Sequence, residues 1–137
     1  MIDLNGGTSM VRDVLRIVVP AVLLLLVGCR SAPLYNVDST PVVANKAVTL
    51  VEVEKAIMRA GAGLGWQIVP RAPGQIEGTL LLRTHRAVVD ISYNTQSYSI
   101  KYKDSTNLDY DGTNIHSNYN GWIQNLDNAI RAQLGLL

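Results

Sequence analysis

Residues 75–103 read QIEGTLLLRTHRAVVDISYNTQSYSIKYK, and apolar and polar side chains alternate through most of this stretch. Alternation with a period of two puts the apolar side chains on one face of a half-buried strand. The clearest segment is Tyr98 to Lys103, where tyrosine and isoleucine alternate with serine and lysine. The stretch predicts three consecutive β-strands, at residues 75–84, 87–93 and 98–103.

A fourth, shorter strand is expected just before this stretch. Residues 66–69 are mostly apolar and stop at Pro70, and Pro73-Gly74 is a typical turn sequence. Short connections, such as the His85-Arg86 pair, join neighbouring strands in antiparallel order. The pattern therefore predicts an antiparallel meander of three or four strands.

Helical patterns lie on both sides of the strands. Thr49 and Glu52 match the capping box, in which each side chain bonds the free backbone N–H of the other residue. Apolar residues then recur every three or four positions, at Leu50, Val53, Ile57, Ala60 and Leu64. A last helix is expected from residues 118–120, with the apolar stripe Trp122, Ile123, Leu126, Ala129, Ile130 and Leu134. Because such stripes are buried against a sheet, we predict a two-layer α+β domain over residues 48–137, with both helices on one face of the meander.

The N-terminal segment has a different character. Arg12 and Arg16 precede the apolar run Ile17 to Val27, which ends at Leu26-Val27-Gly28-Cys29. The run is shorter than the roughly 20 apolar residues of a membrane-spanning helix, and it has the length of a signal-peptide core. In its order of positive charge, apolar run, small residues and cysteine, the segment resembles the lipobox of bacterial lipoproteins.

This resemblance implies a processed and acylated N-terminus. Residues 1–28 would be a signal peptide that is removed, with translation starting at Met10 or the preceding residues tolerated. Cys29 would carry a diacylglyceryl group on its thiol, with a further acyl chain such as palmitate on the new N-terminus. Arg30 stands where an Asp would resemble an inner-membrane retention signal, so the outer membrane is expected. Residues 29–47, rich in proline and polar side chains, are predicted to form a flexible tether.

A polar loop is expected at residues 104–118, before the last helix. Amide, carboxylate and aromatic side chains gather there: Asn107, Asp109, Tyr110, His116, Asn118, Tyr119, Asn120 and Trp122. Two interpretations are open. These side chains form a satisfied network that caps the helix and packs on the sheet, or they form a recognition surface for a protein or a glycan. The loop and the His85 strand are similar to small uncharacterised lipoproteins of Gram-negative bacteria, which implies a compact α+β domain and no particular activity.

Metal binding has weak support in the sequence. Residues 107–112 have the outline of a calcium loop, but Asn118 stands at the twelfth position, where a bidentate Glu is expected. Zinc would require both histidines together with a carboxylate, drawn from the set His85, His116, Asp90 and Asp109. No metal site and no catalytic residue are therefore assigned.

The net charge and the absence of catalytic motifs argue against several classes of function. The chain has 12 Lys and Arg against 11 Asp and Glu, a formal net charge of +1, so it lacks the basic field of a nucleic-acid-binding protein. No nucleophile elbow or HExxH motif is present. We expect a non-enzymatic lipoprotein on the periplasmic face of the outer membrane, with no cofactor besides the covalent lipid on Cys29, that binds another envelope protein or glycan. The alternative is a metal- or small-ligand-dependent activity in the loop 104–120.

Overall fold

The computed structural model describes residues 30–137, so the expected signal peptide and Cys29 lie outside the described residues. The described elements, in chain order, are β1 (Ser31–Pro33), β2 (Val37–Pro41), α2 (Leu50–Gly63), β3 (Gln67–Ala72), β4 (Gln75–Leu82), β5 (His85–Tyr93), β6 (Ser97–Thr106), β7 (Asn114–His116) and α3 (Ser117–Leu134). None of the helices within residues 30–137 combines the length and the apolar character needed to cross a membrane.

The main sheet has five antiparallel strands in the order β2-β6-β5-β4-β3. This confirms an α+β fold with an antiparallel sheet and two helices. The predicted count of three or four strands was too low, because β2 adds to the free edge of β6. A separate two-stranded ribbon, β1 paired with β7, was also not predicted.

The predicted flexible tether at 29–47 is wrong for most of its length. Ser31–Pro33 pairs with β7, and Val37–Pro41 pairs with β6. Val37 is 4% exposed and belongs to the core. These strands have no sequence periodicity because each is short, and their pairing is supplied by partner strands more than 50 residues away in the chain. The folded domain therefore begins at Ser31 and not at residue 48.

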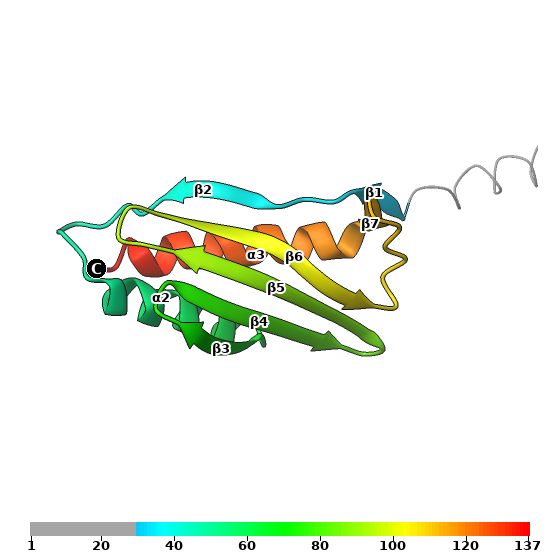
Figure 1. The fold of residues 1–137 in the computed structure, drawn as a ribbon, viewed down its shortest axis with the longest axis horizontal. Coiled ribbons are helices and arrows are strands. Elements are labelled where there is room, and N and C mark those ends of the chain that lie inside the picture. Colours follow the sequence, from blue (N-terminus) through cyan, green and yellow to red (C-terminus); the bar gives the residue numbers. More distant parts are fainter. Residues whose placement is uncertain (1–29) are drawn as a thin grey trace, which may run out of the picture. The chain divides into compact units, whose positions relative to one another are not determined.

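The helices lie together on one face of the sheet, as Figure 1 shows. Thr49 and Glu52 form the predicted capping box at the start of α2. Gly61 lets α2 approach the sheet, because a Cβ there would lie 2.4 Å from Ile68 Cγ1. The core between the layers is built from fully buried side chains, including Ile57, Ile76, Ile91, Ile100, Ile123 and Leu126.

The opposite face of the sheet carries charged side chains. Glu77 on β4 accepts hydrogen bonds from Lys103 at 2.8 Å and from Arg71 at 2.7 Å. These two partners, Lys103 first, lower the pKa of Glu77 to about 2. Lys103 also lies 3.4 Å from Asp90 on the neighbouring strand. This face is therefore a solvated surface held by cross-strand ion pairs.

Candidate functional site

The domain has two structurally different ends, which Figure 1 places at opposite ends of the sheet. The β1 end comprises the β1–β7 ribbon, the β4–β5 hairpin tip and the loop 107–113. The groove end comprises the start of α2, the β3–β4 turn and the C-terminus, where Asn45 Nδ2 donates to the Gly135 carbonyl at 3.1 Å. The residues predicted from the sequence lie at the β1 end.

Both histidines meet at the β1 end. The His85 ring, at the start of β5, lies 6.2 Å from the His116 ring and 6.3 Å from the Trp122 ring, measured between ring centroids. His85 Nδ1 donates to the Asn107 carbonyl at 2.7 Å. The prediction that His85 and Arg86 connect two strands was wrong, because both belong to β5 and the turn is Arg83-Thr84. His85 instead joins the sheet to the loop.

Three tyrosines, from β6, from the loop 107–113 and from α3, form a second cluster at this end. The Tyr102 ring lies 4.2 Å from the Tyr110 ring and 5.7 Å from the Tyr119 ring. Tyr119 is fully buried, and within residues 30–137 its hydroxyl has no hydrogen-bond partner. Burial raises the pKa of Tyr119 well above its usual range. Through these ring contacts, the cluster packs the loop onto β6 and α3.

The polar side chains at this end mostly satisfy the backbone. The Asn120 amide donates to the Pro33 carbonyl at 2.8 Å and accepts from the Tyr35 N–H at 3.0 Å, which fastens β1 to α3. His116 caps α3, since its Nδ1 accepts from the Asn118 N–H at 3.2 Å. Asp111 accepts from the N–H groups of residues 113 and 114. These contacts tie β1, the loop and the start of α3 to one another.

The predicted residues thus separate into two groups. Asn107, His116, Tyr119, Asn120 and Trp122 come together and hold the loop, the ribbon and α3 in place. Asp109 and Asn118 are exposed, and Tyr110 is 37% exposed. Within residues 30–137, no three His, Cys, Asp or Glu side chains gather where they could share a metal ion. The loop 104–118 is not wholly irregular either, because β6 runs to Thr106 and β7 occupies 114–116.

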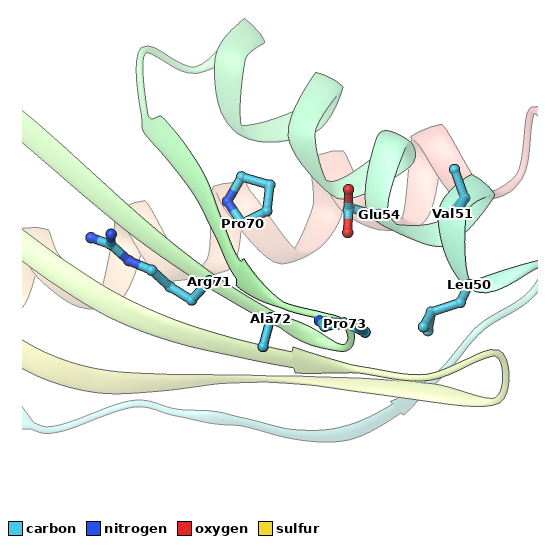
Figure 2. Close-up of a pocket in the computed structure, with 7 residues that line it drawn as sticks. All are labelled: Leu50, Val51, Glu54, Pro70, Arg71, Ala72 and Pro73. Atoms are coloured by element: carbon cyan, nitrogen blue, oxygen red, sulfur yellow. The ribbon is translucent and has the colours of Figure 1, made fainter.

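A groove at the other end was not predicted. It has a volume of about 350 Å³ and lies between the start of α2 and the end of β3 (Figure 2). Its lining is mainly apolar and consists of Leu50, Val51, Glu54, Pro70, Arg71, Ala72 and Pro73. The two walls come from segments separated by α2 itself, so no local sequence pattern indicates the groove. Pro70 and Pro73 were visible in the sequence only as signals of a strand end and a turn.

One hydrogen bond holds Glu54, a side chain that lines the groove. The Tyr93 hydroxyl donates to Glu54 Oε2 at 2.5 Å. Tyr93 is 6% exposed, and its burial, followed by this hydrogen bond, raises its pKa to about 12. Glu54 is therefore oriented by a neutral phenol, while Arg71 is held by Glu77 on the other face of the sheet. The groove offers an apolar surface with one carboxylate beside it.

Three comparisons with known proteins identified no relative of this chain. The chain matches no family model, and no curated protein or solved structure is significantly similar to it.

Proposed function

We propose that this chain is a lipoprotein of the bacterial envelope, anchored by acyl chains on Cys29, whose domain binds another envelope component and is not an enzyme. The proposal rests first on the order of charges, apolar run and small residues that ends at Leu26-Val27-Gly28-Cys29. Two or three acyl chains hold a protein stably on a bilayer, whereas one chain binds only marginally. The periplasmic face of the outer membrane is the proposed location.

The short distance between Cys29 and the fold supports an anchoring role. Only Arg30 separates Cys29 from Ser31, the first residue of β1. Two residues span at most about 7 Å. A lipid on Cys29 would therefore keep the β1 end beside the bilayer.

The groove is the surface that we assign to the partner. The mainly apolar lining suits an apolar group of a partner better than a polar glycan. Strand addition at β3 is disfavoured, because Pro70 lacks an N–H and the register shifts between Pro70 and Ala72. We expect recognition through side chains of an envelope protein that fill the space between Leu50 and Pro73.

Substituting Cys29 tests the anchor. In Cys29→Ser the thiol that accepts the lipid is absent, so we expect the protein to lose incorporation of labelled palmitate and to leave the membrane fraction. A control is Ser31→Ala, which leaves the cysteine in place. If Cys29→Ser still sediments with membranes at the mature mass, the lipid anchor is wrong.

Photocrosslinking in cells tests the partner. A photoreactive residue at Val51, which is 57% exposed beside the groove, should give a reproducible adduct with one envelope protein. Leu64, 41% exposed at the other end of α2, is the matched control. A probe at Tyr110 tests whether the loop makes this contact instead. Adducts that are the same at positions 51 and 64, or absent at both, would contradict binding in the groove.

A further inference from the structure

The β4–β5 hairpin ends in two exposed leucines. Leu81 is 61% exposed and Leu82 is 46% exposed, although the preceding Leu80 is only 7% exposed and belongs to the core. Successive residues of a strand project to opposite faces, so these two side chains lie on opposite sides of the hairpin. A flat protein surface against one face would cover only one of them. A medium that surrounds the tip would cover both.

The turn of this hairpin contains a basic residue, Arg83, in a backbone conformation that is unfavourable for its side chain. Arg83 has φ 55°, a left-handed conformation that glycine or asparagine adopts more easily. Thr84 completes the two-residue turn between Leu82 and His85. The tip thus combines two exposed leucines with an arginine, a composition typical of segments that lie in the interface of an anionic bilayer.

Hydrogen bonds fasten the tip to Asn107, in the loop between β6 and β7. Asn107 Nδ2 donates to Thr84 Oγ1 at 2.7 Å, and the neighbouring His85 donates to the Asn107 carbonyl. The His85 ring lies 6.2 Å from the ring of His116. His116 is the residue that pairs with Ser31, two positions after Cys29. The exposed leucines therefore lie at the end of the domain where the proposed lipid is attached.

We propose that the hairpin tip, residues 81–84, is a second membrane contact, with Leu81 and Leu82 in the headgroup region of the bilayer and Arg83 at the lipid phosphates. This inference rests on the proposed acylation of Cys29. Two attachment points fix the orientation of the domain, which a single anchor does not. Tyr35 and Tyr110, each 37% exposed at the same end, are side chains that suit the bilayer interface.

The test uses the full acylated protein in vesicles of phosphatidylethanolamine and phosphatidylglycerol. An environment-sensitive fluorophore is attached to Leu82→Cys and, as a control, to Leu136→Cys, which is 77% exposed near the C-terminus. Acylation blocks the Cys29 thiol, so the label reaches only the new cysteine. We expect a blue-shifted emission at position 82 that lipids with a spin-labelled headgroup quench, and neither effect at position 136.

Three results would overturn the proposal, and they are distinguishable. A vesicle-bound protein whose label at 82 behaves like the label at 136 removes the second contact alone. A blue shift without quenching by the lipid shows that the tip meets a protein, such as a second copy. If wild-type protein does not float with the vesicles and its Cys29 takes the label, the anchor itself is wrong and this contact fails with it.

Arg83→Asn separates the charge from the fold. Asparagine tolerates the left-handed conformation, so the turn should form as before. Combined with the label at position 82, this change should weaken quenching in vesicles that contain phosphatidylglycerol. Quenching in vesicles of phosphatidylcholine alone should not change. Equal quenching of both proteins in the anionic vesicles would contradict the assigned role of Arg83.

Discussion

The two ends of the domain expose apolar side chains in opposite ways. At the groove end, Leu50 and Val51 line a hollow beside a capped helix start. At the β1 end, Leu81 and Leu82 stand on a projecting hairpin tip. A hollow can enclose a segment of a partner, whereas a projecting tip is covered only by something that surrounds it. The shape around an exposed leucine therefore distinguishes the two surfaces better than its exposed fraction does.

The ends also differ in whether the hydroxyl of a buried tyrosine has a hydrogen-bond partner. Tyr98, in β6, donates to Asp127 Oδ1 at 2.5 Å, and Arg131 holds the other carboxylate oxygen at 3.1 Å. Burial, followed by this hydrogen bond to Asp127, raises the pKa of Tyr98 well above its usual range. Tyr119, at the β1 end, is equally buried but has no partner for its hydroxyl within the described residues.

The largest effect is expected from neighbouring leucines on β4. Leu80→Ala opens a cavity in the core and should lower the free energy of unfolding by about 2–4 kcal/mol. Leu81→Ala should change it by less than about 0.5 kcal/mol, because Leu81 is exposed. Urea denaturation of both variants measures the difference. A large loss in Leu81→Ala would mean that the hairpin tip supports the fold and would break the contrast between the ends.

The two tyrosines give the next largest difference. Tyr98→Phe leaves Asp127 buried without this donor, so we expect a loss of about 1–3 kcal/mol of unfolding free energy. Tyr119→Phe removes a hydroxyl that has no partner and should be neutral or stabilising. Thermal unfolding of the two variants compares them directly. Equal destabilisation would show that the Tyr119 hydroxyl is bonded after all.

Removing the cap of α2 should have a smaller effect at the groove end. Thr49→Ala removes the acceptor for the Glu52 N–H, at 3.2 Å, and should lower the free energy of unfolding by about 1 kcal/mol. Thr49→Ser keeps the hydroxyl and is the control. Hydrogen exchange should show faster opening at the start of α2 and unchanged protection of α3. Uniform loss of protection along both helices would argue against independent ends.

The smallest effect concerns acid stability at the same cap. Hydrogen bonding from Lys46, followed by the Thr49 backbone, lowers the pKa of Glu52 from 4.5 to about 2. A carboxylate with a lowered folded-state pKa stabilises the fold above its unfolded pKa, and this contribution is lost as the pH falls toward 2. Glu52→Gln should therefore be less stable than wild type at pH 7. The difference should vanish near pH 2, which unfolding curves across this range measure. A difference independent of pH would contradict the role of the ionised group.

Much of the sheet could be predicted from local patterns. Alternation marked β4, β5 and β6, and the Thr49 capping box marked the start of α2. β2 could not be predicted, because Val37–Pro41 becomes a strand only by pairing with β6. Of the candidate site residues, the sequence identified the cluster around His116 and Trp122 but could not tell structural contacts from recognition. That distinction depends on tertiary contacts, such as the bond from the Asn107 amide to the Thr84 hydroxyl and the bond from the Asn120 amide to the Pro33 carbonyl.

The sequence alone determined which segments form the helices and the central strands, because the periods 2 and 3.6 are properties of the chain itself. It also carries the pattern that ends at Cys29, on which the proposed anchor rests. The tertiary structure decided where the ends of these elements meet. It placed the tip at Leu82 beside the β1 ribbon and formed the groove between α2 and β3, since both depend on contacts between segments that are distant in the chain.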